Sequence, residues 1–349
     1  MLKTLKKKPF MLVLTLLILL SMLAACSSGS DKASGDKGKS GSGDQYTIRV
    51  AYSVPEDHAS HIAGLAFKED IEAKSDGKIK VELFPNGQLY ASDREAVEAV
   101  QLGNIEMTVI ATPTMATFAP EFSIFDLPFL FDSREAAYKA MDGELGNALN
   151  EKVDEIGLVS LGYGENGFRH LVNNKHKIEK PEDMKGLKMR VMENKVYEDM
   201  FNALGANSSP LAFGELYSAL QQGVFDGMDN PISLISSMKF YEVQKYLTLS
   251  SHTFAPIISV INKDYFEGMP EDLQATLKES MTDVYNKTQR ETTQQQDEEK
   301  LKELEKDMEI NELTAKQKKA FADALQPIFD KYSGEIGEDL IEMAKAANE

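Results

Sequence analysis

Apolar and polar residues alternate with a period of two in several short segments, as is typical of half-buried strands. In the segment 187–192, Leu187, Met189 and Val191 share one face, so Arg190 lies on the opposite face. On an isolated strand that face meets solvent, whereas in a two-domain protein it can face a cleft. A guanidinium on a rigid strand above a cleft suits a carboxylate, because its planar fork matches both oxygens. Arg190 is therefore a candidate anion-binding residue, with an exposed strand arginine as the alternative.

Strand-like and helix-like segments alternate along most of the chain, which predicts an α/β fold with a largely parallel sheet. The segment 227–231 is expected to be a turn leading into a helix. The expected strands are 46–53, 78–84, 107–110, 158–162, 187–192 and 254–262. The expected helices are 62–74, 92–102, 133–140, 144–152, 194–204 and 213–222. The aromatic-rich run 118–131 is expected to be core.

The segment 271–308 is predicted to be one long helix. Apolar residues recur at helical spacing in its first part, the middle 286–300 is polar on all sides, and Leu301 and Leu304 resume the apolar stripe. At 1.5 Å per residue the helix would measure roughly 57 Å, enough to lie across two domains. A coiled-coil dimer is the competing interpretation, although the polar middle lacks apolar heptad positions.

Two short motifs raise the question of cofactors and metals. Gly162, Gly164 and Gly167 have the G-x-G-x-x-G spacing of dinucleotide-binding loops, but the residues after them read as extended, and a pyrophosphate needs a helix N-terminus there. These glycines better suit a strand that bends as it crosses between domains. His58 and His61 lie three residues apart without a further ligand cluster. No cofactor or metal is expected, and His58 is kept as a ligand-contact candidate.

The N-terminus has the pattern of a secretory signal. Three lysines precede an apolar run at 10–20, and Leu-Ala-Ala-Cys at 23–26 resembles a lipobox. Residues 1–25 are therefore predicted to be a lipoprotein signal peptide and Cys26 the lipidated N-terminus. A signal-anchor helix is the alternative, but the apolar run is short for a bilayer span. Residues 26–45, rich in Ser, Gly, Lys and Asp, are predicted to be a flexible tether.

Charge narrows the possible partners. The chain of 349 residues has a net charge of −18, and residues 1–25 carry four Lys and no acid, so the mature chain stands near −18 − 4 = −22. This argues against nucleic acid, which demands a basic face, but not against a small anion held by local positive charge. Cys26 is the only cysteine, which leaves no disulfide within the chain, no cysteine nucleophile and no thiolate metal site.

The second half of the chain contains an ordered series of motifs: GLKMRV at 186–191, ALGAN at 203–207, LAFGELYSALQQGVFDG at 211–227, NP at 230–231 and KFYEVQKY at 239–246. This series resembles one known family, the solute-binding receptors of TRAP transporters, which take up organic acids. The resemblance runs from about Tyr46 to the C-terminus.

The resemblance implies a two-lobed clamp of the class II periplasmic-binding-protein type, with hinge crossings and a long helix that spans both lobes. Lobe one is expected at 46–166 plus 254–294, and lobe two at 167–253 plus 295–349. The expected partners are a carboxylate ligand and the membrane permease subunits of a TRAP transporter. The protein is expected outside the cytoplasm, lipid-anchored to the membrane.

The resemblance also places a second arginine, Arg169, at the ligand carboxylate. The ligand-binding residues expected together are Arg190, Arg169, Asn230, Phe213, Asn194, Glu193, Tyr52 and His58. Of these, Glu193 and Asn194 would offer partners for ligand hydroxyls. No catalytic residue is expected.

The ligand and the class of protein leave alternatives open. Ala111-Thr112-Pro113 stands where the sialate-binding branch of the family has an acidic residue, which counts against sialate. C4-dicarboxylates and sugar acids both remain, with hydroxylated acids slightly favoured. A secreted hydrolase using Asp226 and Asp229 as paired carboxylates is an alternative from another class. A receptor of an ABC transporter would share the clamp architecture.

Overall fold

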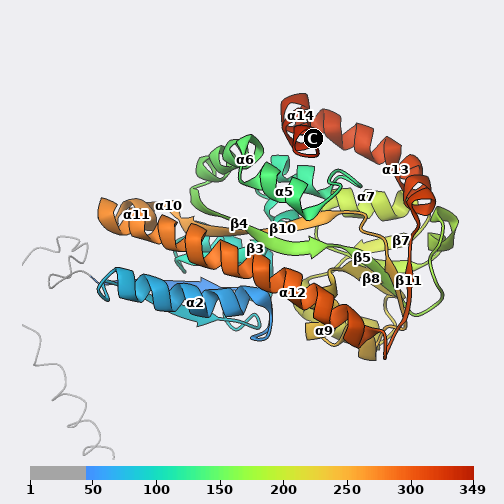
Figure 1. Ribbon diagram of the computed structural model, residues 1–349, viewed down its shortest axis with the longest axis horizontal. Helices are drawn as coiled ribbons and strands as arrows, with labels where there is room; N and C mark the ends of the chain where they lie inside the picture. The colour runs from blue at the N-terminus through green and yellow to red at the C-terminus, as the bar shows by residue number, and fades with distance from the viewer. Residues whose placement is uncertain (1–44) are drawn as a thin grey trace, which may run out of the picture. The chain divides into compact units, whose positions relative to one another are not determined.

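The computed structural model describes residues 45–349, which contain two β-sheets flanked by helices (Figure 1). The predicted signal peptide, the lipidation at Cys26 and all but the last residue of the predicted tether lie outside the described residues. The α/β class and the two-lobed type of fold are confirmed, since each sheet has its own helices and hydrophobic core.

The first sheet has the strand order β2-β1-β3-β10-β4. β1 runs parallel to β2 and β3, whereas β10 runs antiparallel to both β3 and β4. The sheet is therefore mixed rather than largely parallel, because β10 enters it from the other sheet. The strands are β1 (Tyr46–Ala51), β2 (Ile79–Phe84), β3 (Met107–Ala111), β4 (Leu158–Phe168) and β10 (Phe254–Asn262).

The second sheet has the order β11-β9-β5-β8-β6-β7. β8 lies inside it, hydrogen-bonded to β5 and β6, so the expected turn at 227–231 is instead a buried strand. Gly227, its first residue, leaves room for β5, because an added Cβ would lie 2.2 Å from the Val172 carbonyl oxygen. The strands are β5 (His170–Asn173), β6 (Lys188–Val191), β7 (Asn207–Pro210), β8 (Gly227–Asn230), β9 (Tyr246–Leu249) and β11 (Glu309–Glu312).

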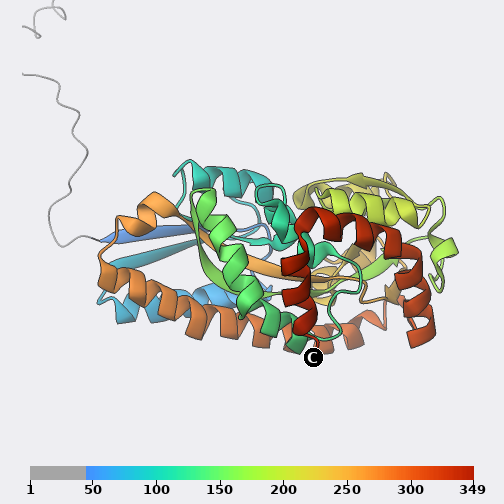
Figure 2. The same ribbon diagram turned by 90° about the horizontal axis from the view of Figure 1, so that it is seen from above.

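The helices cover the faces and outer edges of the sheets (Figure 2). They are α2 (Ala59–Lys74), α3 (Asp93–Gln101), α4 (Thr112–Met115), α5 (Arg134–Met141), α6 (Glu144–Glu155), α7 (Lys195–Ala203), α8 (Leu216–Gln221), α9 (Ile232–Ser237), α10 (Lys263–Glu267), α11 (Glu271–Ser280), α12 (Lys287–Leu304), α13 (Ala315–Ile336) and α14 (Glu338–Ala346). Short 3₁₀ turns occupy Pro120–Asp126, Pro181–Met184, Phe213–Glu215 and Phe240–Glu242. The expected helix at 213–222 is thus a 3₁₀ turn followed by α8.

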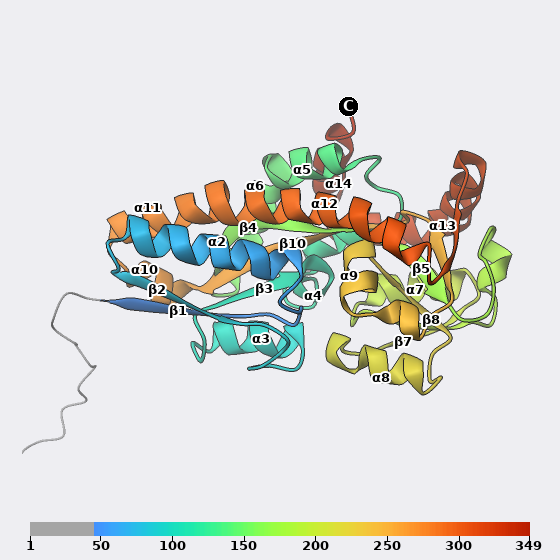
Figure 3. The ribbon, with the colours of Figure 1, turned by 60° about the horizontal axis from the view of Figure 1, so that its bottom comes forward.

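The predicted long helix is present as α11 and α12, joined by a π-helical turn at Met281–Asn286 (Figure 3). It packs along α2 beside the first sheet and continues to α9 beside the second. Its polar middle is not all solvated. Asn286, Gln289 and Thr293 are buried against β4, which is the edge strand of the first sheet. These side chains bond the backbone of that edge, which would otherwise be unpaired.

The glycines of β4 permit this close approach. Gly162 has φ +103°, and an added Cβ would lie 2.4 Å from the Asn286 amide nitrogen. At Gly164 an added Cβ would lie 2.5 Å from Gln289 Oε1. The G-x-G-x-x-G spacing therefore serves helix packing against a strand that leads from one sheet to the other.

The chain passes between the sheets at Arg169, between β4 and β5, and at 250–253, between β9 and β10. The expected lobe boundaries at 166/167 and 253/254 lie beside these passages. The C-terminal segment departs from the expected assignment of 295–349 to lobe two. Phe321 and Leu325 of α13 pack in a core of the second sheet, but Tyr332 packs in a core of the first sheet, and α14 packs against α5 and α6.

Candidate functional site

A cavity of about 490 Å³, a volume that includes open solvent at its mouth, lies where strands of both sheets end. Side chains at or just beyond the carboxyl ends of β1, β3, β6 and β8 reach it, which is the edge where open α/β sheets bind ligands. At Gly214 an added Cβ would lie 3.1 Å from the Ala91 carbonyl oxygen, so the two sides of the cleft are close at this point. The lining residues are Ser53, Val54, His58, Ser60, Asp93, Val109, Ile110, Ala111, Asn166, Arg169, Arg190, Met192, Phe213, Asn230, Leu234 and Ile257.

Arg190 lies on β6 and is only 2% exposed, so its strand face meets the cavity and not the outer solvent. Its Nε and Nη2 donate to the Leu211 carbonyl oxygen at 2.8 and 2.6 Å. Among residues 45–349, no carboxylate forms an ion pair with it. Nη1 is left without a protein partner among these residues, so an incoming carboxylate would meet the end of the guanidinium rather than its Nε edge.

Arg169 is 1% exposed and lies at the passage between β4 and β5. Its Nε donates to Asp229 Oδ2 at 2.5 Å and its Nη2 to the Asp229 carbonyl oxygen at 2.5 Å, and its guanidinium lies 5.3 Å from the centre of the Tyr197 ring. Burial alone would lower the pKa of Arg169, but Asp229 keeps it raised. Asp229 thus orients Arg169 and supplies one countercharge.

Of the two guanidiniums in the cavity, only Arg169 has an ion-pair partner among the described residues, because Asp229 is bound to it. Burial, and then the positive charge of Arg169, lower the pKa of Arg190 to about 10, so Arg190 remains protonated at neutral pH. Asp229 and, more weakly, Asp93 offset part of this unfavourable environment without pairing with Arg190, and a bound anion would relieve the remaining repulsion. The second-sheet side of the cavity is therefore the side suited to an anion.

The first-sheet side of the cavity carries hydrogen-bonding groups of another kind. Ser53 Oγ donates to Asp93 Oδ1 at 2.7 Å. Burial raises the pKa of Asp93, while the Ser53 hydroxyl and, more weakly, Arg190 oppose the rise. His58 caps α2, and its Nδ1 accepts from Ser60 N at 3.2 Å, so the proton of the neutral ring resides on Nε2. Burial lowers the pKa of His58 to about 4, and its Nε2 has no partner among the described residues.

Five of the predicted ligand-binding residues line this one cavity, namely Arg190, Arg169, Asn230, Phe213 and His58. The structure does not bring the other three to it. Tyr52 points into the core and bonds His61 Nδ1 at 2.6 Å. Asn194 caps α7, and its amide donates to the Pro113 carbonyl at 3.0 Å and to Asp126 at 2.8 Å. Glu193 is exposed.

Several lining residues were not among the predicted site residues, notably Asp93, Asn166, Met192 and Leu234. Asp93 had a usable signal, because Ser92 and Glu95 mark a helix start there, and helix starts in α/β folds face the ligand edge. Met192 continues the face of Arg190 along β6. Asn166 and Leu234 had no signal in the local pattern.

The carboxylates proposed for a hydrolase are not paired. Asp229 is held by Arg169, and Asp226 accepts from Lys188 N at 2.9 Å and pairs with the exposed Lys175. Burial would raise both pKa values, but these partners hold each below the usual range of Asp. Neither is poised as a general acid at neutral pH.

Within residues 45–349, no group of three or more His, Cys, Asp and Glu side chains is placed to hold a metal ion. None of the described helices has the length and apolarity needed to cross a membrane.

A two-sheet α/β fold with a cavity of unsatisfied positive charge between the sheets defines a receptor for small anions. The comparison with known proteins agrees, since residues 50–335 match the model of the bacterial extracellular solute-binding proteins, family 7. The chain belongs to this family, whose members bind solutes outside the cytoplasm; the expected receptor class is confirmed.

Named relatives make the resemblance specific. The chain is 36% identical to the C4-dicarboxylate-binding periplasmic protein DctP of Rhodobacter capsulatus over 310 residues, which are 86% of this chain and 90% of the relative. A TRAP periplasmic solute-binding protein from Sulfurospirillum deleyianum with bound succinate superimposes with a TM-score of 0.82 at 36% identity, covering 87% of this chain and 99% of the other. The sugar-acid-binding protein DctPAm from Advenella mimigardefordensis with galactonate superimposes with a TM-score of 0.84 at 36% identity, covering 87% and 98%.

Proposed function

We propose that this protein captures a small hydroxylated carboxylic acid in the cavity between the two sheets and delivers it to the membrane subunits of a TRAP transporter. The observation that carries the proposal is the buried Arg190, which has no carboxylate partner among the described residues and lies beside the buried Arg169. A bound carboxylate supplies the missing negative charge. The family and the relatives that bind organic acids support the same reading.

The polar groups on the first-sheet side favour hydroxyl groups over a second carboxylate. A hydroxyl can donate to the Asp93 carboxylate and accept from His58 Nε2 at the same time. A second carboxylate near Asp93 would place two like charges in a buried site. The relatives include binders of both classes, so C4-dicarboxylates are the second candidate.

We further propose that the two sheets, with their helices, act as lobes that close over the ligand. The passages at Arg169 and 250–253 and the helix α12 would serve as the hinges. Phe213 would pack on the carbon skeleton of the ligand, and Asn230, which is 2% exposed, would add a hydrogen bond. Closure excludes water and so strengthens every polar contact inside the cavity.

The choice of ligand class is tested by comparing acids of equal carbon number, such as succinate and erythronate, for their effect on the melting temperature of the mature chain. A ligand at 100 times its Kd adds about 2.7 kcal/mol to the free energy of unfolding. Erythronate is expected to raise the melting temperature more than succinate. Asp93→Asn should weaken erythronate binding and strengthen succinate binding.

Glu95→Gln is the matched control for Asp93→Asn, because Glu95 lies on the same helix outside the cavity and bonds Ala91 N. It should leave both affinities unchanged. Tighter binding of succinate than of hydroxy acids, unaffected by Asp93→Asn, would reverse the assignment in favour of C4-dicarboxylates. No shift with any organic acid would reject the receptor proposal.

We also propose that Cys26 carries a lipid anchor. The support is the residue pattern at 1–26, with a basic start, an apolar run and small residues before the cysteine. Cys26→Ser in cells should release the protein from the membrane fraction and abolish its labelling by radioactive palmitate. Membrane retention of the Cys26→Ser protein would point to the signal-anchor alternative.

A further inference from the structure

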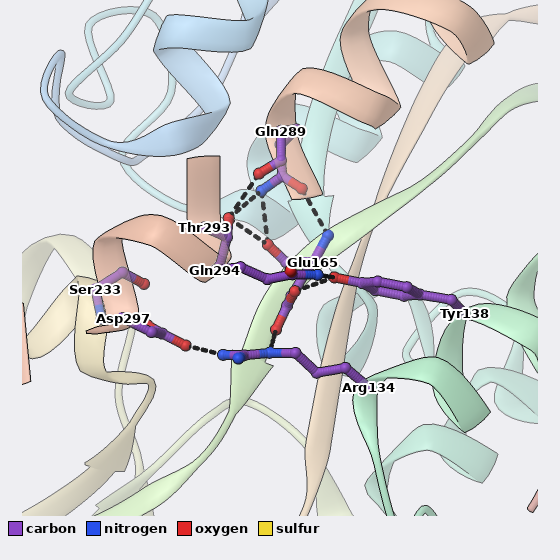
Figure 4. A network of polar contacts seen from close by, with 8 residues as sticks. All are labelled: Arg134, Tyr138, Glu165, Ser233, Gln289, Thr293, Gln294 and Asp297. Carbon is purple, nitrogen blue, oxygen red and sulfur yellow. Dashed lines mark hydrogen bonds and ion pairs between the residues drawn. The ribbon is translucent and has the colours of Figure 1, made fainter. Parts of the chain in front are cut away.

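A buried polar network lies where elements of both sheets meet the helix α12 (Figure 4). Its centre is Glu165 of β4, which is fully buried. Glu165 accepts from Arg134 Nε at 2.6 Å and from the Tyr138 hydroxyl, both on α5. Its backbone N and O bond Gln289 of α12 at 2.7 and 2.6 Å. The crossing strand is thus tied to α5 and α12 at one residue.

Asp297 extends this network to the second sheet. Its Oδ2 pairs with Arg134 Nη2, while its Oδ1 accepts from Ser233 N, in the first turn of α9, at 3.1 Å. Its side chain is 11% exposed. One carboxylate therefore joins α5, which belongs to the first-sheet side, to α9, which follows β8 of the second sheet.

The two segments joined in this way both carry cavity residues. Asn166 and Arg169 lie one and four positions beyond Glu165 in the chain, and Asn230 and Leu234 flank Ser233. The segments are also close to each other, since an added Cβ at Gly167 would lie 3.4 Å from the Pro231 side chain and 3.5 Å from Asp297 Oδ2. The network therefore adjoins four residues that line the cavity.

We infer that Asp297 is a positioning residue for ligand capture. Paired with Arg134, it holds the start of α9 against the crossing strand, and so keeps the two halves of the ligand cavity in register without touching the ligand. The inference rests on the proposed function of the cavity. Hydrogen-bond and ion-pair networks that join separate elements are one route by which a residue outside a site can change its affinity.

The test is Asp297→Asn in the mature chain. The amide oxygen can still accept from Ser233 N, but the ionic bond to Arg134 is lost. The affinity for the acid found by the thermal-shift screen should fall by roughly 3- to 30-fold, as for other residues that act through a coupled network. The decrease in radius of gyration on ligand addition, measured by small-angle X-ray scattering, should shrink as well. A merely structural role would lower the melting temperature without changing this ligand-dependent compaction.

Two further variants make the result decisive. Glu298→Gln removes a neighbouring exposed carboxylate of the same helix and should leave affinity and compaction unchanged. Arg134→Gln breaks the same pair from the other side and also removes the ionic bond to the buried Glu165, so its melting temperature is measured alongside its affinity. If the pair acts as one unit, the double variant should lose no more affinity than the more affected single variant.

Unchanged affinity and compaction in both single variants would overturn the inference, and so would additive losses in the double variant. Failure here is distinct from failure of the proposed function. If the wild-type protein binds no organic acid, the proposed function is wrong. If the wild type binds and compacts but the variants match it, only the role of Asp297 is wrong.

Discussion

Arg190→Ala is expected to abolish measurable binding of the cognate acid. The guanidinium is buried, keeps its charge and has no ion-pair partner among the described residues, so under the proposed function the ligand carboxylate would be its countercharge. Truncating one member of such a desolvated pair costs about 2–5 kcal/mol, which is a Kd increase of roughly 30-fold to several thousand-fold. Isothermal titration calorimetry on the mature chain measures the change.

Two variants separate the charge of Arg190 from other effects. Arg190→Met keeps a long side chain and removes the charge, so it should lose nearly as much affinity as Arg190→Ala. Arg94→Ala removes an exposed arginine that pairs with Glu98 on α3, and it should leave the affinity unchanged. Because Arg190 is buried beside a second cation, Arg190→Met should not destabilise the ligand-free protein. Calorimetry showing wild-type affinity in Arg190→Met would discard the anion site.

Asp229→Asn is expected to destabilise the ligand-free protein by about 3–5 kcal/mol, because it leaves Arg169 buried without a countercharge. Asp229 is fully buried and bonds Arg169 through both its side chain and its carbonyl, and His252 Nε2 lies 3.3 Å from its Oδ2. The free energy of unfolding in urea is the measurement. Saturating ligand should recover part of the loss, because under the proposed function its carboxylate would lie beside the same guanidinium.

Asp226→Asn is the matched control, because Asp226 lies three residues earlier and pairs with the exposed Lys175. Removing an ion pair of this kind changes the free energy of unfolding by at most about 1 kcal/mol. If Asp229→Asn were as stable as Asp226→Asn, the Arg169–Asp229 pair would not be what compensates the buried charge.

Much of the fold followed from local patterns. The period of two at 187–192 placed Arg190 opposite the core, and the structure has it on the cavity face of β6. Helical spacing predicted α11 and α12 as one element. The failure at β8 has a physical reason: Gly227, Asp229 and Asn230 are typical of turns, and only burial between β5 and β6 makes this segment a strand.

The residues of the candidate site were predicted less completely than the fold, because the contacts of a side chain depend on segments that are distant in the sequence. Asn194 was expected at the ligand, but both ends of its side-chain amide have protein partners. Its Oδ1 accepts from Val196 N at the start of α7, and its Nδ2 donates to the Pro113 carbonyl oxygen. Asp93 and Asn166 reach the cavity only through the packing of elements that are far apart in the chain. A local pattern assigns a residue to a face, but it does not say what that face will meet.

By itself, the sequence determined the α/β class, the receptor family and the strand face that carries Arg190, because periodicity and ordered motifs are local properties of the chain. Only the tertiary structure decided that Asp229, 60 residues away, neutralises Arg169 while Arg190 stays without a countercharge among the described residues. The tertiary structure also decided the partners of the polar residues in the long helix. Asn286, Gln289 and Thr293 bond the backbone of the crossing strand β4, and Asp297 bonds Ser233 of α9. The reason is that buried charges and amides are satisfied by whichever groups the fold brings within hydrogen-bonding distance, and that choice is made across the whole chain.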